Sequence, residues 1–140
     1  MVAVRAEKLS THRALVVEDN EHVAYMLEFM LERAGYDVIM AANGRDALAA
    51  VENIAPVDVI LLDLMLPYVS GYQIITDVRE HRDWQYVPIV VLSGKVLEED
   101  IVRALDLGAN DYVTKPFRPE ELLARLRRVV ADNERRAPIR

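Results

Sequence analysis

Several residue types and patterns are missing or scarce in this chain of 140 residues, and each absence limits what it can do. There is no cysteine, which excludes disulfide bonds and thiolate metal sites and suits a reducing compartment such as the cytoplasm. No apolar stretch approaches the length of a membrane span, and residues 1–13 lack the apolar core of a secretion signal. We therefore expect a cytoplasmic protein with no membrane contact.

Basic residues are fewer than acidic ones, 17 against 23, which gives a formal net charge of −6 at pH 7. The net negative charge of such a domain would be repelled by the phosphates of a nucleic acid, so we expect no direct nucleic-acid binding. Asp132 and Glu134 interrupt the arginines near the end of the chain, which favours a solvated helix face over a basic patch. The three histidines, His12, His22 and His81, have no metal-ligand spacing, and we expect them on the surface.

Short apolar runs alternate five times with segments of helical periodicity. The expected strands cover residues 14–18, 37–41, 57–63, 89–93 and 111–114. The expected helices cover residues 21–34, 45–54, 71–81, 98–107 and 119–131, the first capped by Asn20 and ended by Gly35. Five such units with short links predict one α/β domain, a doubly wound parallel sheet with helices on both faces. Residues 1–12 and 132–140 are polar and are expected to form a flexible N-terminal segment and a C-terminal tail or linker.

Acidic residues follow two of the buried apolar runs. Glu18 and Asp19 close the first run, and Asp63 closes the third. In an open α/β sheet, ligands bind beyond the carboxyl ends of the strands. Three carboxylates gathered there would repel one another unless a cation lay between them. The pattern therefore predicts a metal site.

Four separated motifs carry a resemblance to a known family. They are Glu18-Asp19, Asp63-Leu64-Met65-Leu66-Pro67 with Gly71 beyond, Ser93-Gly94, and Tyr112-Val113-Thr114-Lys115-Pro116-Phe117. Over residues 13–131 the chain resembles the receiver domain of two-component response regulators. The resemblance implies the flavodoxin-like fold with five βα units and strand order 2-1-3-4-5, which makes the first and third strands neighbours.

The resemblance also implies roles for the motif residues. Asp63 would accept a phosphoryl group from a sensor histidine kinase or a phosphotransfer protein, in a reaction that the domain catalyses on itself rather than on external substrates. Mg²⁺ would be held by Glu18, Asp19, Asp63 and the backbone carbonyl of Met65. Lys115 would pair with Asp63 or the phosphoryl oxygens, Ser93 would donate its hydroxyl to them, and Tyr112 would turn inward as Ser93 moves.

The output of such a switch is suggested by a further likeness, to receivers of the OmpR/PhoB-type winged-helix subfamily. These dimerise through the face of the fourth helix, fifth strand and fifth helix, and control transcription through an effector domain that this chain lacks. The likeness implies that Arg103 pairs with Glu121, and Asp111 with Arg125, across a two-fold axis. Asn110 departs from the acidic residue common in that subfamily.

Two other functions have to be weighed against a phosphoacceptor. A pseudo-receiver would keep the fold as an interaction module without phosphorylation, but Asp63, the acidic pair and Lys115 are all retained. A phosphohydrolase of the haloacid dehalogenase type would need a second aspartate two residues after its nucleophile, and here that position is Met65. We therefore expect the phosphoacceptor, with the pseudo-receiver as the alternative.

Overall fold

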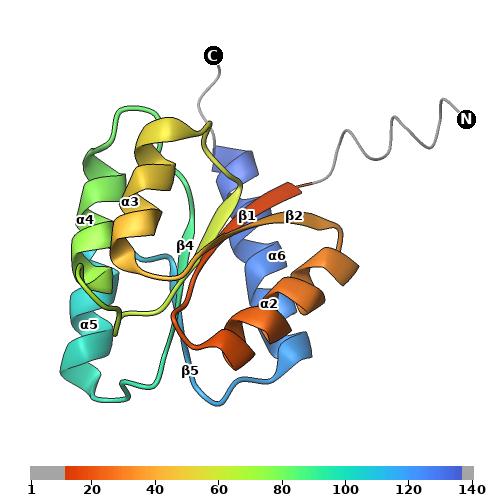
Figure 1. Ribbon diagram of the computed structural model, residues 1–140. Helices are drawn as coiled ribbons and strands as arrows, with labels where there is room; N and C mark the ends of the chain where they lie inside the picture. The colour runs from red at the N-terminus through yellow and green to blue at the C-terminus, as the bar shows by residue number, and fades with distance from the viewer. Residues whose placement is uncertain (1–11, 137–140) are drawn as a thin grey trace, which may run out of the picture.

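The computed structural model describes residues 12–136, in which strands and helices alternate along the chain (Figure 1). The strands are β1 (His12–Val17), β2 (Tyr36–Ala41), β3 (Val59–Leu62), β4 (Ile89–Ser93) and β5 (Asp111–Thr114). The helices are α2 (Glu21–Arg33), α3 (Gly44–Asn53), α4 (Gly71–Glu80), α5 (Glu98–Leu107) and α6 (Pro119–Arg136). Every predicted element is present, and most ends agree within one or two residues.

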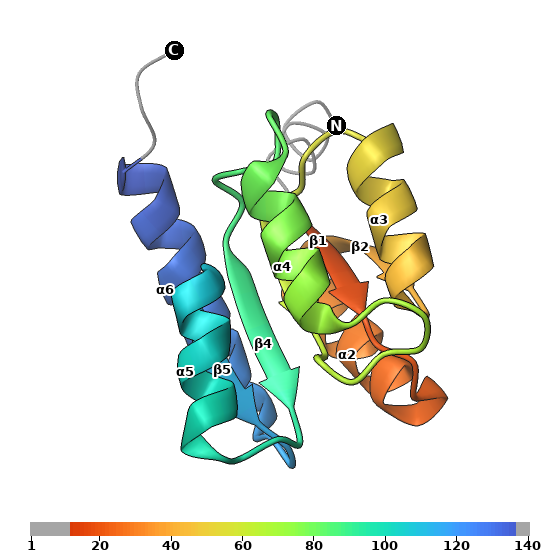
Figure 2. The ribbon, with the colours of Figure 1, turned by 90° about the vertical axis from the view of Figure 1, so that its left-hand side faces the viewer.

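The five strands form one parallel sheet in the order β2-β1-β3-β4-β5, which confirms the predicted fold class. Helices α3, α4 and α5 cover one face of the sheet, and α2 and α6 cover the other (Figures 1 and 2). Because successive strand residues point to opposite faces, Leu15 and Val17 belong to the core under the first group, and Ala14 and Val16 to the core under the second. Strand β3 is apolar and buried along its whole length because helices cover both faces of the sheet.

Local signals at the helix ends agree with the structure. The side chain of Asn20 accepts a hydrogen bond of 3.0 Å from the backbone N–H of Val23, and so caps α2 as predicted. Gly35 follows this helix with a φ of 96°, a conformation that L side chains rarely adopt. Ser70 caps α4 by accepting a hydrogen bond from Gln73. The caps at Asn20 and Ser70 fix where the loops at the carboxyl edge of the sheet end.

The predicted end of the last helix is wrong. Helix α6 continues to Arg136, five residues beyond the predicted end at residue 131, so residues 132–136 belong to the helix rather than to a flexible tail. An ion pair between Asp132 and Arg135 and a hydrogen bond between Glu134 and His12 stabilise this extension. Strand β1 likewise begins earlier than predicted, at His12. The rest of the two predicted flexible segments, residues 1–11 and 137–140, lies outside the described residues.

No helix within residues 12–136 combines the length and the apolar character that crossing a membrane requires.

Candidate functional site

The carboxyl ends of β1 and β3 bring the predicted acidic residues together. The backbone N–H of Asp63 donates to the carbonyl of Val17 at 3.0 Å, and that of Glu18 donates to the carbonyl of Ala41, also at 3.0 Å. These bonds extend the sheet ladder by one residue, so that Glu18 and Asp63 leave neighbouring strands side by side. Glu18, Asp19 and Asp63 each offer a carboxylate oxygen, and the three oxygens lie within 4.8 Å of one another.

Two of these carboxylates are buried. Glu18 is 3% exposed and Asp63 is 6% exposed, whereas Asp19 lies open to solvent. Burial raises the pKa of Glu18, because a charged carboxylate loses its hydration; the hydrogen bond with Lys115 and the one from Asn20 oppose this only in part. The backbone N–H of Met65 donates to Asp63 Oδ1 at 3.1 Å and orients that side chain.

Lys115 reaches the carboxylates from the end of β5. Its backbone N–H donates to the carbonyl of Ser93 at 2.9 Å, and its peptide bond to Pro116 is cis. Its Nζ lies 2.9 Å from Glu18 Oε1 and 3.3 Å from Asp63 Oδ2. Burial by itself lowers the pKa of Lys115, but the hydrogen bond to Glu18 and the charges of Asp63 and Glu18 outweigh it, and the pKa is raised.

The donor set fits a hard divalent cation. Lys115 pairs with two of the three carboxylates, so the cluster keeps an excess of negative charge, and its donor atoms are all oxygen. Mg²⁺ prefers oxygen ligands and is held by one to a few carboxylates while it keeps several waters. Met65 follows Asp63 in the same loop and its side chain is exposed. The ligand role of its carbonyl stays a prediction.

Glycines allow the loop after Asp63 to run close to its neighbours. The N–H of Gly71 donates to the carbonyl of Leu64, and a Cβ at position 71 would lie 2.6 Å from the carbonyl oxygen of Asp63. At the first residue of α3, a Cβ on Gly44 would collide with the carbonyl oxygen of Val69. The loop is therefore clamped at both ends by close backbone contacts that a side chain would break.

Ser93 and Tyr112 are linked through Lys95. Ser93 is fully buried at the end of β4, and its Oγ accepts a hydrogen bond of 3.2 Å from the N–H of Lys95. The hydroxyl of Tyr112 donates to the carbonyl of Lys95 at 2.9 Å. Sequence reasoning named Ser93 and Tyr112 but gave no reason to place Lys95 between them, because the link runs through backbone atoms.

The residues expected to pair across a two-fold axis have partners inside the chain. Arg125 lies 3.1 Å from Asp111 and 3.0 Å from Glu121, measured between guanidinium nitrogens and carboxylate oxygens. The guanidinium of Arg103 instead stacks 3.9 Å above the ring of Tyr72, a contact that the sequence did not suggest. The structure thus brings Asp111, Glu121 and Arg125 together and places Arg103 against a different partner.

Asn110 departs from the subfamily pattern, and its side chain forms hydrogen bonds within the domain. Its Oδ1 accepts hydrogen bonds of 2.8 Å from both Arg79 and the backbone N–H of Ile89. Arg79 also donates to the carbonyls of Gly108 and Val87, so it fastens α4 to the segments that lead into β4 and β5. Asn110 therefore has a structural contact that accounts for its presence.

Comparisons with known proteins show the family to which the chain belongs. The response regulator receiver domain family matches residues 14–127. The chain is 42% identical over 126 residues to the alkaline phosphatase synthesis transcriptional regulatory protein PhoP of Bacillus subtilis, an alignment that covers 90% of this chain and 51% of that protein. The chain thus spans about half the length of this relative.

Solved structures show the same fold. The CheY-like receiver domain protein of Methanospirillum hungatei superposes with a TM-score of 0.85 at 27% identity, covering 91% of this chain and all of that one. The receiver domain of sensor histidine kinase PA1611 from Pseudomonas aeruginosa, solved with a magnesium ion in its active-site cleft, gives a TM-score of 0.80 at 34% identity, covering 87% of this chain and 99% of that one. The chain therefore belongs to the family of response regulator receiver domains, which serve two-component signalling.

Proposed function

We propose that this domain accepts a phosphoryl group on Asp63 from the phosphohistidine of a sensor histidine kinase or a phosphotransfer protein. The observation that carries the proposal is the placement of Asp63, buried at the carboxyl end of β3 with one oxygen held by the N–H of Met65 and the other 3.3 Å from Lys115. A carboxylate fixed in this way is an oriented nucleophile. We also propose a cytoplasmic location, because it is consistent with the response regulator family.

The covalent step follows from the chemistry of the two partners. An oxygen of Asp63 attacks the phosphorus in line, an O–P bond forms, and the N–P bond of the phosphohistidine breaks. The electron pair of that bond stays on the imidazole nitrogen. The histidine leaves as a neutral imidazole when its other ring nitrogen carries a proton, and otherwise takes up one proton to become neutral. Lys115, already beside Asp63, pairs with the phosphoryl oxygens as a point charge. Water later hydrolyses the acyl phosphate and resets the domain.

The residues that would hold Mg²⁺ are Glu18, Asp19, Asp63 and the carbonyl of Met65. The bound ion would neutralise charge that develops on the phosphoryl oxygens. Glu18 also holds Lys115, at 2.9 Å, and so keeps its ammonium within reach of Asp63.

Phosphorylation would act on the rest of the domain through Ser93 and Tyr112. The modification adds about 1.5 to 2 negative charges and strong acceptor oxygens at Asp63. Ser93 would turn its hydroxyl toward these oxygens and give up the hydrogen bond from Lys95. Because Tyr112 bonds to the carbonyl of Lys95, a shift of this segment changes the position of the tyrosine and thus the face of α5, β5 and α6.

Acetyl phosphate tests the proposal without a cognate kinase. The protein is incubated with acetyl phosphate and Mg²⁺, and its intact mass is recorded. A gain of one phosphoryl group that depends on Mg²⁺ supports the phosphoacceptor. If Mg²⁺ binds but no phosphoryl group is gained from acetyl phosphate or a phosphorylated kinase, the domain is instead a pseudo-receiver interaction module.

Asp19→Asn is expected to weaken Mg²⁺ binding. Asp19 is the exposed member of the cluster, so its replacement removes a ligand with little effect on the core. Loss of groups that merely orient a metal ligand already costs about tenfold in affinity, and loss of the ligand itself should raise the Kd for Mg²⁺ by about tenfold or more. Calorimetric titration measures this Kd. Asp106→Asn, an exposed change on α5, serves as control; equal Kd values for the two variants would remove Asp19 from the ligand set.

The face of α5, β5 and α6 is expected to form a homodimer when Asp63 carries a phosphoryl group. Val102 and Leu105 of α5 are 45% and 43% exposed, and β5 and α6 carry the charged residues Asp111, Glu121 and Arg125. Those charges pair within the chain, so a two-fold partner must share or exchange their bonds.

Sedimentation velocity checks this expectation. The wild type should shift from monomer to dimer when acetyl phosphate and Mg²⁺ are added, and Arg125→Ala should reduce the shift. Arg82→Ala, an exposed change in the turn after α4, should dimerise like the wild type. A phosphorylated wild type that stays monomeric would contradict the proposed interface. Control of transcription through an effector domain would then need another arrangement.

A further inference from the structure

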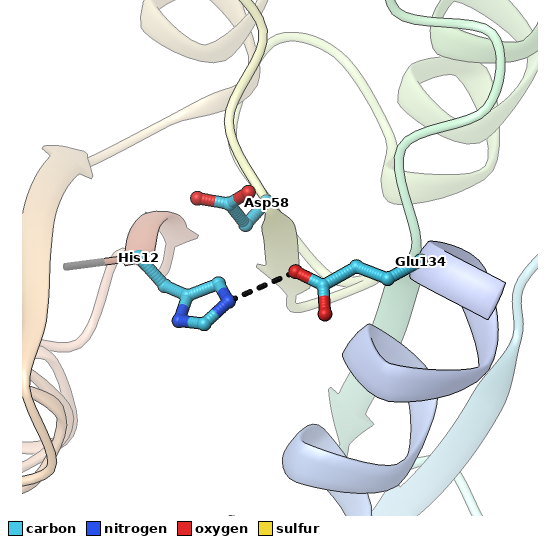
Figure 3. Close-up of side chains that lie close together, drawn as sticks. All are labelled: His12, Asp58 and Glu134. Atoms are coloured by element: carbon cyan, nitrogen blue, oxygen red, sulfur yellow. Dashed lines mark hydrogen bonds and ion pairs between the residues drawn. The ribbon is translucent and has the colours of Figure 1, made fainter. Parts of the chain in front are cut away.

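A second cluster of chemically reactive side chains lies at the opposite edge of the sheet, where β1 and β3 begin and α6 ends (Figure 3). It consists of His12, Asp58 and Glu134. His12 and Glu134 are 122 positions apart in the sequence, and their side chains meet through a hydrogen bond of 3.1 Å between Nε2 and Oε2. None of the three residues belongs to the site of Asp63.

The backbone holds Asp58 in place beside β1. The N–H of Asp58 donates to the carbonyl of Arg13 at 2.9 Å, and the N–H of Arg13 donates to Asp58 Oδ2 at 2.7 Å. One carboxylate oxygen is thereby used for orientation, and Oδ1 has no hydrogen bond among the described residues. An outer hydrogen bond of this kind orients the ligands of many metal sites.

The three side chains provide one imidazole nitrogen and two carboxylate oxygens, all within 4.8 Å of one another. The side chains of His12 and Glu134 are 41% and 60% exposed, and Asp58 is half-buried, so an ion can enter from solvent. With a neutral imidazole the cluster carries two negative charges, which match one divalent cation. Ligand atoms of Zn²⁺ lie about 2.0 to 2.2 Å from the ion, so binding would draw these three side chains closer together.

We propose that His12, Asp58 and Glu134 bind a divalent transition-metal cation, for which Zn²⁺ is the probe. The imidazole of His12 distinguishes this cluster from the all-oxygen set of Glu18, Asp19 and Asp63. Imidazole is a good ligand for Zn²⁺ and other transition-metal ions, whereas carboxylates alone favour Mg²⁺. The bound ion would fasten the last turns of α6 to the first residues of β1 and β3.

The charges around the cluster give a test that does not depend on removing a ligand. Arg127 of α6 lines the same pocket as His12 and Glu134, together with Tyr36, whose ring centroid lies 5.8 Å from that of His12. A cation at the cluster would be repelled by this guanidinium. Arg127→Gln should therefore strengthen Zn²⁺ binding, although it touches none of the three ligands.

The experiment uses the full chain without a histidine tag and with Mg²⁺ at saturation, so that the site of Asp63 is occupied. Zn²⁺ is titrated in competition with a chromophoric chelator. The wild type should bind one Zn²⁺ that His12→Ala, Asp58→Asn or Glu134→Gln each weakens by about tenfold or more. His22→Ala, which removes an exposed histidine of α2, should bind Zn²⁺ like the wild type. Mg²⁺ affinity, measured for each variant, shows that it is folded.

Hydrogen exchange gives a second measurement. Zn²⁺ should slow amide exchange in residues 132–136 of the wild type, and should not do so in His12→Ala. Absence of saturable Zn²⁺ binding would overturn the proposal. So would unchanged binding in His12→Ala, or loss of binding in His22→Ala. These outcomes leave the proposed phosphorylation of Asp63 untouched, because that reaction is measured separately by intact mass.

Discussion

Asp63→Asn is expected to reduce phosphorylation by acetyl phosphate to background, a loss of at least roughly 10³-fold by analogy with enzymes that lose a nucleophile. Asparagine has nearly the same shape and can still accept the hydrogen bond from Met65 through its carbonyl oxygen. Its amide, however, is a poor nucleophile and carries no charge to hold Mg²⁺ or to pair with Lys115, which lies 3.3 Å from Asp63. The intact mass after incubation with acetyl phosphate and Mg²⁺ measures the effect.

Asp37→Asn is the matched control, since Asp37 is an exposed aspartate on β2. This variant should gain one phosphoryl group like the wild type. A gain in Asp63→Asn at the rate of the wild type would show that another residue is the acceptor. If both variants fail to react, the loss reflects a general effect on the protein and the assignment to Asp63 would lose its support.

Trp84→Ala is expected to lower the free energy of unfolding by about 3 to 5 kcal/mol. Trp84 lies in the turn after α4, is fully buried, and is the largest of the fully buried side chains. It belongs to the core cluster that the sheet forms with the helices α3, α4 and α5. Its removal leaves a cavity that the surrounding side chains can close only in part, and a urea unfolding curve measures the loss.

Tyr86→Ala, two residues further on, tests whether burial is the cause. Tyr86 is 59% exposed, so its replacement should change the free energy of unfolding by less than about 1 kcal/mol. Equal destabilisation of the two variants would contradict the role given to Trp84. Under conditions where the Trp84→Ala variant stays folded, this variant should still be phosphorylated. Trp84 forms no hydrogen bond with the described residues around Asp63.

The order and type of the elements could be predicted from local patterns. Apolar runs such as 14–17 and 59–62 can be buried on both faces only inside a covered parallel sheet, and Asn20 and Gly35 mark the ends of α2. The end of α6 was predicted wrongly because the local sequence contains no stop signal there. No glycine or proline lies between residues 131 and 137, so nothing local ends the helix, and its final turns depend on Asp132, Glu134 and their partners.

The acidic site was partly predictable because the order of the strands determines which of its residues lie close together. In a parallel sheet, residues that follow neighbouring strands must lie at the same edge, which places Glu18 and Asp19 near Asp63. The motif resemblance then supplied Lys115 and Ser93. The burial of Glu18 and Asp63, and the double contact of Lys115 with them, are tertiary features that the spacing of residues does not contain.

The sequence by itself determined the alternation of strands and helices and the fold class, and it named the candidate site residues, since these depend on local periodicity and on short motifs. Only the tertiary structure decided which side chains meet. Arg125 pairs with Asp111 inside the chain, Arg103 stacks on Tyr72, and His12 meets Glu134 across 122 positions. Such contacts are set by how the strands are ordered and how far each helix extends, and no local pattern records them, because their partners are brought together only when the sheet and its two helical layers are assembled.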